Sequence, residues 1–339
     1  LLATFLYLYY YFAELRNRHK EFNPGLLIKA QLEAAVNLCR GSRKVLQLLL
    51  LLTAVSIIWA GIIFPPKQEL TVTFIDVGQG AAALIETPCK TVILVDAGGE
   101  PAFRGDPGSV GEKIIIPFLR YRNIKKLDLA IITHPHEDHF GGFIPLIDKI
   151  PVKQMLISPV PGSSPYYEEL LNNASERGVI IGEAEAGHIW VCGDYLQLQF
   201  LSPPATLYTG TGSDLNNNSL VFMLHFAEIK MLFTGDLEER ATRGLIAGGY
   251  DLQADLLLVP HHGAYLEAMP DLLNAVRPEL AVIQVGINSF GHPHPFTVQT
   301  LQDAEVAIYR NDLHGAVIVR TDGLKLEVRF TDQGETAVR

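Results

Sequence analysis

Cysteine is scarce in this chain, with three residues among 339. Cys39, Cys89 and Cys192 lie far apart, which excludes a disulfide-rich scaffold and a zinc site built from closely spaced cysteine pairs. The sequence leaves open whether Cys89 and Cys192 form a disulfide in an oxidising compartment. Positive charge is also limited, because 27 basic residues are outnumbered by 37 acidic ones, giving a net charge of −10. This balance argues against nucleic-acid binding over the whole surface.

Long uncharged runs, by contrast, occur near the start. Residues 45–64 carry no charged side chain and are long enough to cross a hydrocarbon core of about 30 Å, although a buried helix of a soluble protein is the alternative. Residues 1–12 resemble the end of another transmembrane helix. The chain opens with Leu rather than Met, so we expect it to be the C-terminal part of a longer protein.

The charges between these runs predict an orientation. Residues 13–44 hold seven basic and three acidic side chains, so the positive-inside rule assigns this loop to the cytoplasm. Residues 65–339 would then form an extracytoplasmic domain in which acidic residues predominate. We therefore expect a multi-pass protein of a plasma membrane.

The densest polar motif follows the apolar run 127–133 and reads His134-Pro-His136-Glu137-Asp138-His139. Imidazole and carboxylate groups are the usual ligands of zinc and its first-row neighbours. The spacing predicts a metal-binding loop, with a chance polar surface loop as the alternative. Glu137 is expected not to bind metal, because alternation along the loop turns its side chain away from its neighbours.

Three other polar groups follow apolar runs that we expect to be buried strands. They are Asp236, the pair His261 and His262, and the pair His292 and His294. Polar groups at the ends of several buried strands can converge on one site.

Strand-like segments come first in residues 65–339 and then alternate with helix-like segments. We expect strands at 70–76, 81–86, 91–95, 127–133, 230–234, 254–260 and 279–285. We expect helices at 112–122, 166–177, 238–246, 268–276 and 296–304. This order predicts an α/β fold in which two packed sheets are covered by helices on both outer faces.

The ordered motifs DVGQG, LVDAG, THPHEDHFGG, NNNSL, FTGD, VPHHGA and GHPHP resemble the metallo-β-lactamase superfamily. More narrowly, they resemble the ComEC family of bacterial DNA-uptake channels, over about residues 70–330. The resemblance implies a metallo-β-lactamase αββα sandwich preceded by a transmembrane helix. It also implies a hydrolase that uses two divalent metal ions, zinc or manganese, outside the inner membrane.

The resemblance implies roles for the polar groups. The implied ligands are His134 and His136 for one ion, Asp138, His139 and either His261 or His262 for the second, and Asp236 as a bridge. Asp138, Asp236, His292 and His294 are the implied catalytic residues. His292 and His294 would contact phosphate or protonate the leaving group, unless they are loop histidines held by neighbouring backbone. Asp76 and Asp96 are expected to orient ligands.

This chain departs from the family pattern in three places. The stretch from Asn217 to Leu220 stands where lactam-hydrolysing members place another metal-binding histidine, and His225 is expected to be structural. Ala81-Ala82 replaces a common Asp-Ala, and Ala264 replaces a common Ser. Lost polar groups beside a site could reduce or alter activity.

The implied substrate is DNA, with hydrolysis of the strand that is not imported. Implied partners are membrane lipid, other competence proteins and the upstream transmembrane channel region of the same protein. The alternatives are another hydrolase, acting on a thioester, lactam or lipid-linked phosphodiester, and a non-catalytic cap that guides DNA. One basic segment could steer phosphate or be a solvated helix face: Lys113, Arg120, Arg122, Lys125 and Lys126.

Overall fold

The computed structural model describes residues 29, 43–63, 69–193, 196–331 and 336–338. The chain divides into two compact units, Leu1–Lys67 and Gln68–Arg339. In the first, helix α3 (Arg43–Ile63) covers nearly all of the apolar run 45–64. Among the residues that the structure describes, no helix meets the length and hydropathy needed to cross a membrane. The predicted helix end at 1–12 and most of the predicted loop at 13–44 lie outside the described residues.

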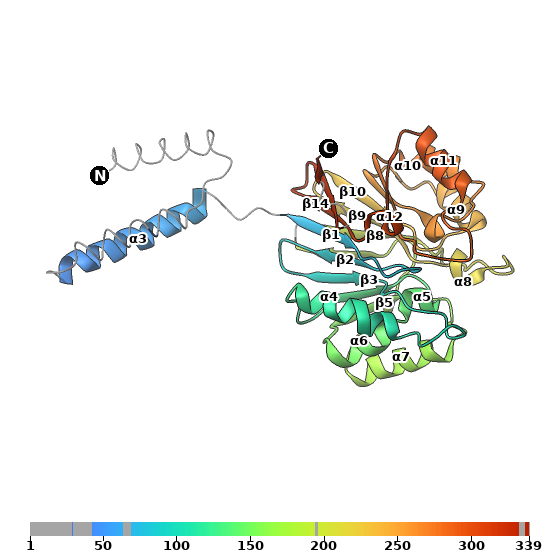
Figure 1. Cartoon of the computed structure of the whole chain (residues 1–339), viewed down its shortest axis with the longest axis horizontal. Coiled ribbons are helices and arrows are strands. Elements are labelled where there is room, and N and C mark those ends of the chain that lie inside the picture. Colours follow the sequence, from blue (N-terminus) through green and yellow to red (C-terminus); the bar gives the residue numbers. More distant parts are fainter. Residues whose placement is uncertain (1–28, 30–42, 64–68, 194–195, 332–335, 339) are drawn as a thin grey trace. The chain divides into compact units, whose positions relative to one another are not determined.

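Two mixed sheets lie face to face in the unit Gln68–Arg339 (Figure 1). The first has the order β16-β15-β14-β1-β2-β3-β4-β5-β6, and its strands are β1 (Leu70–Phe74), β2 (Ala83–Glu86), β3 (Val92–Val95), β4 (Leu129–Ile132), β5 (Gln154–Ile157), β6 (Ile180–Glu183), β14 (Val317–Thr321), β15 (Leu326–Phe330) and β16 (Thr336–Val338). The second has the order β13-β12-β11-β10-β9-β8-β7, and its strands are β7 (Ile189–Cys192), β8 (Leu196–Ser202), β9 (Val221–Phe226), β10 (Ile229–Phe233), β11 (Leu256–Leu258), β12 (Leu280–Ile283) and β13 (Ala307–Arg310).

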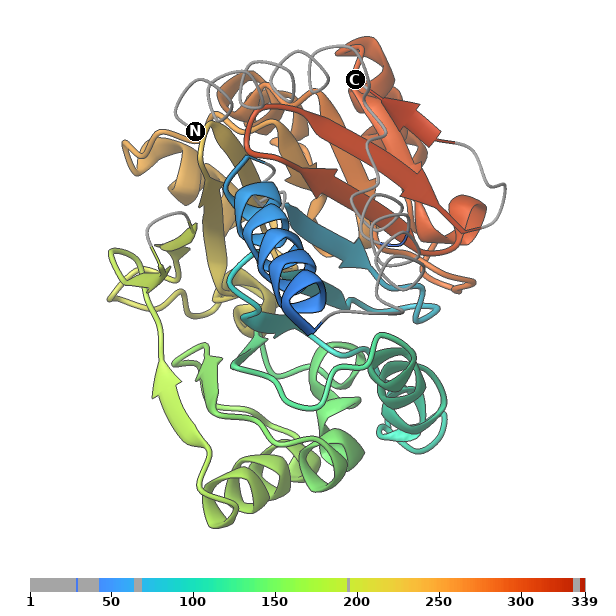
Figure 2. The same cartoon turned by 90° about the vertical axis from the view of Figure 1, so that its left-hand side faces the viewer.

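Helices cover the outer face of each sheet (Figure 2). Those connected to the first sheet are a π-helical segment (Gly111–Ile115) that continues into α4 (Ile116–Tyr121), then α5 (Glu137–Phe140), α6 (Phe143–Lys149) and α7 (Pro165–Glu176). Those connected to the second sheet are α8 (Asp214–Asn217), α9 (Glu239–Ala247), the short 3-10 turn Pro260–Gly263, α10 (Met269–Val276), α11 (Pro295–Asp303) and α12 (Asn311–His314).

Three hydrophobic cores hold these layers together. One fills the space between the sheets and includes the stacked rings of Phe222 and Phe233. A second lies between the first sheet and helices α4, α6 and α7, and a third lies between the second sheet and helices α9, α10 and α11. The expected α/β sandwich, helices outside and sheets inside, is therefore confirmed.

Each sheet contains a run of parallel strands that sets the position of the polar motifs. Strands β3 to β6 are parallel in the first sheet, and strands β10 to β13 are parallel in the second. Polar residues follow the carboxyl ends of β3, β4, β10 and β11. Ligand sites in sheets of this kind form where carboxyl strand ends meet.

The two cysteines of this unit lie next to each other. Cys89 is in the turn between β2 and β3, Cys192 ends β7 in the other sheet, and their Sγ atoms are 3.0 Å apart. With glutathione disulfide as oxidant, we expect this pair to form a disulfide that links the sheets across 103 sequence positions. The disulfide should raise Tm by about 5–10 °C through restriction of the unfolded chain.

Mass spectrometry and thermal unfolding measure this prediction in a Cys39→Ser background, so that only this pair can react. A further Cys192→Ser change serves as the control, in which oxidant should leave Tm unchanged. The prediction is wrong if the oxidised protein loses no mass of two hydrogens, or if its Tm matches that of the reduced protein.

Candidate metal centre

The predicted metal-binding loop lies between β4 and α6 and is held by two glycine-containing turns. The Ala81 N–H donates to the Asp138 carbonyl at 3.2 Å, and the Ala97 N–H donates to the His139 carbonyl at 2.7 Å. Gly99 has φ +154° and lies so close that a Cβ atom there would collide with the Glu137 carbonyl. Only glycine fits such an approach. The turns therefore fix the position of the loop through its backbone.

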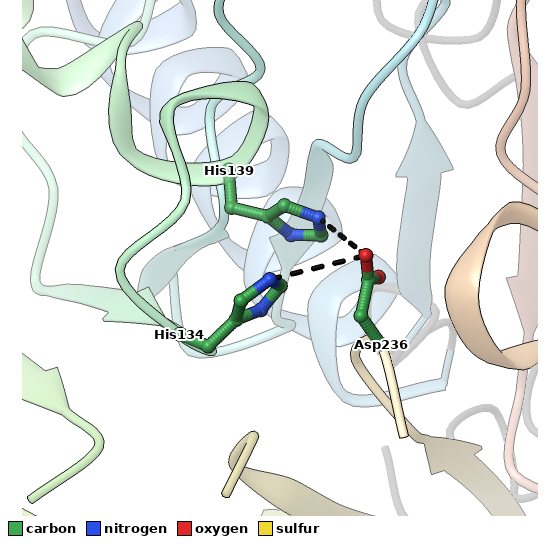
Figure 3. A group of neighbouring side chains, drawn as sticks. All are labelled: His134, His139 and Asp236. Atoms are coloured by element: carbon green, nitrogen blue, oxygen red, sulfur yellow. Dashed lines mark ion pairs between the residues drawn. The ribbon is translucent and has the colours of Figure 1, made fainter. Parts of the chain in front are cut away.

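Three buried side chains from this loop and from the end of β10 meet at one carboxylate oxygen (Figure 3). Oδ2 of Asp236 is 3.2 Å from Nε2 of His139 and 3.9 Å from Nε2 of His134. These three residues form a group whose ligand atoms all lie within 4.8 Å of one another, close enough to hold a metal ion.

A second group of potential ligands shares His139 with the first. It consists of Asp138, His139 and His262, again with ligand atoms within 4.8 Å of one another. Nε2 of His262 is 3.4 Å from Oδ2 of Asp138 and 3.4 Å from Oδ2 of Asp236. Asp236 is thus adjacent to both groups, as a bridging ligand would be.

Polar groups behind the imidazoles of His139 and His262 fix their orientation. Oδ2 of Asp96 lies 2.9 Å from Nδ1 of His139, and Oδ1 of Asp96 accepts the Thr133 N–H at 2.8 Å. Nδ1 of His262 lies 2.8 Å from the Gln284 carbonyl, to which it donates. Each Nε2 atom is therefore turned toward the cluster, in the way that partners behind metal-binding histidines commonly arrange.

These Nε2 atoms are the feature that best fits a metal. Nε2 of His139 and Nε2 of His262 are buried and, among the described residues, form no well-aligned hydrogen bond, although carboxylate oxygens lie 3.2–3.4 Å away. A cation bound between these nitrogens and carboxylates would satisfy both kinds of group. The nitrogen and carboxylate donor set suits zinc or manganese.

The electrostatics of the cluster also favour a bound cation. Burial favours the neutral carboxyl of Asp236, but the imidazoles of His139, His262 and His261 outweigh it and hold its pKa well below the ordinary value. Burial likewise opposes protonation of His139 and His262, yet the carboxylates around them raise both pKa values, that of His262 to about 10. The carboxylates thus attract positive charge, which protons supply here and divalent ions could supply in their place.

Two other histidines lie at the edges of the cluster. Nδ1 of His136 is 2.9 Å from Nε2 of His134, so these nitrogens face one another. His261 is 26% exposed, with Nε2 at 3.8 Å from Oδ2 of Asp236 and Nδ1 at 3.6 Å from Oε1 of Glu238. Of the pair that the sequence could not separate, His262 belongs to a potential ligand group and His261 does not.

The two later histidines differ in placement. The ring of His292 lies 5.3 Å from that of His261 and 6.5 Å from that of His262. Burial and these two imidazoles lower the pKa of His292 to about 4, so its ring is neutral at pH 7. His294 instead caps α11, because its Nδ1 accepts the Phe296 N–H at 3.2 Å. This contact matches the alternative of a loop histidine held by neighbouring backbone.

The structure separates the two acidic residues expected to orient ligands. Asp96 has that role at His139, as described above. Asp76 does not: it is exposed, and its Oδ1 accepts the Gly78 N–H at 3.1 Å within its own turn. The expectation for Asp76 was wrong because a strand-end carboxylate can cap the next turn instead of facing the site.

The basic segment lies at the far end of β4 from the metal-binding loop. Arg122 pairs with Glu86 at 2.7 Å, and Lys126 pairs with Asp128 at 2.6 Å, just before β4 begins. His134 follows the other end of that strand, and a strand advances about 3.3 Å per residue. This placement disfavours phosphate steering and favours a solvated helix face.

Two residues to which the sequence analysis assigned no role, Ser219 and Gln284, support the cluster. The Asp236 N–H donates to Oγ of Ser219 at 3.2 Å. Nε2 of Gln284 donates to the Ala82 carbonyl at 2.7 Å, which ties the two sheets together behind the metal-binding loop. A buried glutamine inside the apolar run 279–285 was the signal that could have identified Gln284. His225, on β9 opposite Lys230, takes no part, as expected.

The assignment of His136 and Glu137 gives a paired prediction. Glu137→Gln should keep the metal content of the purified protein, because Glu137 belongs to neither potential ligand group among the described residues. His136→Ala should lower metal content, since its ring nitrogen faces that of His134. Elemental analysis after dialysis measures both variants. Equal losses would show that the loop is assigned incorrectly.

Comparison with known proteins agrees with this geometry. The metallo-beta-lactamase superfamily profile matches residues 75–286. Over 263 residues the chain is 33% identical to ComE operon protein 3 of Bacillus subtilis, covering 75% of this chain and 33% of that protein. It is 28% identical over 256 residues to competence protein ComA of Neisseria gonorrhoeae, covering 74% of this chain and 32% of that protein. It is 30% identical over 264 residues to recombination protein 2 of Haemophilus influenzae, covering 78% of this chain and 30% of that protein. The chain thus spans about a third of the length of these relatives.

Proposed function

Because the chain belongs to the metallo-beta-lactamase superfamily and its relatives are competence proteins, as in the ComEC family, we propose that the unit Gln68–Arg339 is a two-metal hydrolase that cleaves DNA during uptake. Its product would be the degraded strand that is not imported. The observation that carries the proposal is the single oxygen of Asp236 adjacent to two potential ligand groups.

The proposed division of ligands between two ions combines these groups with the roles that the family resemblance implies. His134 and His136 would hold one ion, Asp138, His139 and His262 would hold the other, and Asp236 would bridge them. When bound, two such ions activate water and neutralise charge on a phosphodiester.

His292 is proposed to act on the substrate side of the cluster. Its neutral ring can hydrogen-bond a phosphodiester oxygen or accept a proton. His294 contributes through position, because its cap on α11 fixes the loop that carries His292. Asp96 holds the imidazole of His139 in one orientation.

A nuclease assay tests this function. The full chain, loaded with manganese or zinc, is incubated with end-labelled single-stranded and duplex DNA, and in parallel with a thioester and a lactam. We expect metal-dependent DNA cleavage that a chelator abolishes. Turnover of only a non-nucleic substrate would assign another hydrolase. DNA binding without turnover of any substrate, by fully loaded protein, would favour a guiding cap and direct attention to Ala81, Ala82 and Ala264.

We also propose that the domain is tethered to the plasma membrane and lies outside it. The uncharged composition of residues 45–64 and the basic loop at 13–44 support this arrangement. Lipid, the upstream channel region and other uptake proteins would be its partners. A cysteine introduced near residue 335, in a background without native cysteines, should react with an impermeant reagent in cells whose outer barrier is opened. Reaction only after lysis would reverse the topology.

A further inference from the structure

We propose that Phe103, Arg104 and Phe290 form a surface that stacks a base of single-stranded nucleic acid beside the metal centre. The choice of ligand rests on the proposed function, but the surface itself is defined by contacts independent of it. Phe103 and Arg104 belong to the loop between β3 and α4, and Phe290 belongs to the loop between β12 and α11. These loops come from different sheets.

Arg104 joins the two loops. Its guanidinium carbon lies 5.5 Å from the ring centroid of Phe103 and 5.5 Å from that of Phe290. Its Nη2 also donates to Oγ of Ser289 at 2.9 Å. Contacts between a cation and aromatic rings favour this grouping of the three side chains. Among the described residues Arg104 forms no ion pair, so its charge stays available to an anion.

The surface continues into the metal centre through histidine rings. The ring centroid of Phe290 is 5.8 Å from that of His292, which is in turn 6.5 Å from that of His262. His262 lies 3.4 Å from both Asp138 and Asp236. A strand that contacts Phe290 is therefore two ring-to-ring steps from the proposed ligands.

The aromatic rings are unusually exposed for their size. Phe103 is 81% exposed and Phe290 is 57% exposed. Single exposed apolar side chains are common, but here two exposed rings and a cation contact one another, and a contiguous patch of this kind marks a site of contact with a ligand. Here the exposed faces are aromatic and are accompanied by a cation, which are the two features that bind single strands.

The charge of the loop shows whether attraction to phosphate or stacking on bases supplies most of the affinity for nucleic acid. Glu100 and Asp106 lie in the same loop as Arg104, so the loop as a whole is not basic. General attraction to phosphate is therefore weak, and base stacking must supply most of the binding. A duplex hides the faces of its bases, so the surface selects single-stranded nucleic acid.

Binding, rather than cleavage, tests the proposal. Fluorescence anisotropy measures the affinity of the metal-loaded full chain for a short single-stranded oligonucleotide with phosphorothioate linkages, which slow hydrolysis. A matched oligonucleotide has the same backbone but abasic positions. Phe290→Ala and Phe103→Ala should each weaken binding to the intact strand roughly tenfold and leave the abasic strand unaffected. Phe290→Trp should restore binding.

Arg104→Ala should weaken binding to both oligonucleotides and reduce the salt dependence by about one phosphate contact. The matched control is Tyr166→Ala, which removes an exposed ring on α7 and should change nothing. If ring removal weakens intact and abasic strands equally, or duplex as much as single strand, the surface does not stack bases. If the rings are needed for anionic phospholipid vesicles and not for DNA, the surface contacts membrane and the proposal is wrong. If the wild-type protein binds the single strand as expected but hydrolyses no DNA, the proposed hydrolase is contradicted and this surface is not.

Discussion

Asp236→Ala should remove most of the bound metal and lower hydrolytic activity more than about 100-fold, because changing a group that merely orients metal ligands already costs 10–100-fold. Its Oδ2 atom is the point at which the two potential ligand groups meet, 3.2 Å from His139 and 3.4 Å from His262. Asp236 faces the Nε2 atoms of His139 and His262, whereas Asp96 contacts His139 on the opposite, Nδ1 side. The variant therefore loses the proposed bridging ligand.

Elemental analysis and an assay of metal-loaded protein measure the two effects. His225→Ala is the matched control, since it removes a partly buried imidazole on β9 that lies opposite Lys230 and away from the cluster. Thermal unfolding in chelator separates loss of metal from loss of fold, because both variants should then unfold at similar temperatures. Unchanged metal content in Asp236→Ala would contradict the bridging assignment.

The sequence predicted the layers and most of the candidate site for a physical reason. Buried parallel strands read as continuous apolar runs, and the polar residues that follow them must emerge at one edge of the sheets. His139 and Asp236 are about a hundred positions apart, yet both follow such runs and meet at 3.2 Å. Motif order was therefore sufficient to predict which strand ends converge.

Closeness in sequence did not predict which basic residues lie near the metal centre. Arg122 and Lys126 precede the metal-binding loop closely in sequence, but β4 lies between them and the cluster, and acidic residues pair with both. Arg104 is more distant in sequence, yet its loop returns to the cluster through contact with Ser289 and Phe290. Only the tertiary structure could identify which cation lies beside the site.

The sequence also could not predict the directions of the side chains of the adjacent histidines, His261 and His262. Both His261 and His262 adopt left-handed backbone, with φ 49° and 54°, which non-glycine residues rarely do. Two consecutive residues of this kind send their side chains in directions that no helical or strand periodicity predicts. Such backbone strain is commonly found at functional sites.

His262→Ala should therefore lower metal affinity more than about 100-fold, whereas His261→Ala should lower it less than about tenfold. His262 is buried, its Nδ1 is fixed by the Gln284 carbonyl, and its Nε2 is turned toward Asp138 and Asp236. His261 is partly exposed and lies between Asp236 and Glu238 at longer distances.

Metal titration of both variants compares two changes that remove the same chemical group one residue apart. Each variant keeps a residue with a Cβ atom in the left-handed region, so backbone strain is similar in both, and a difference in metal affinity reports on ligand position. Equal losses would mean that both imidazoles bind metal, and a larger loss in His261→Ala would reverse the assignment.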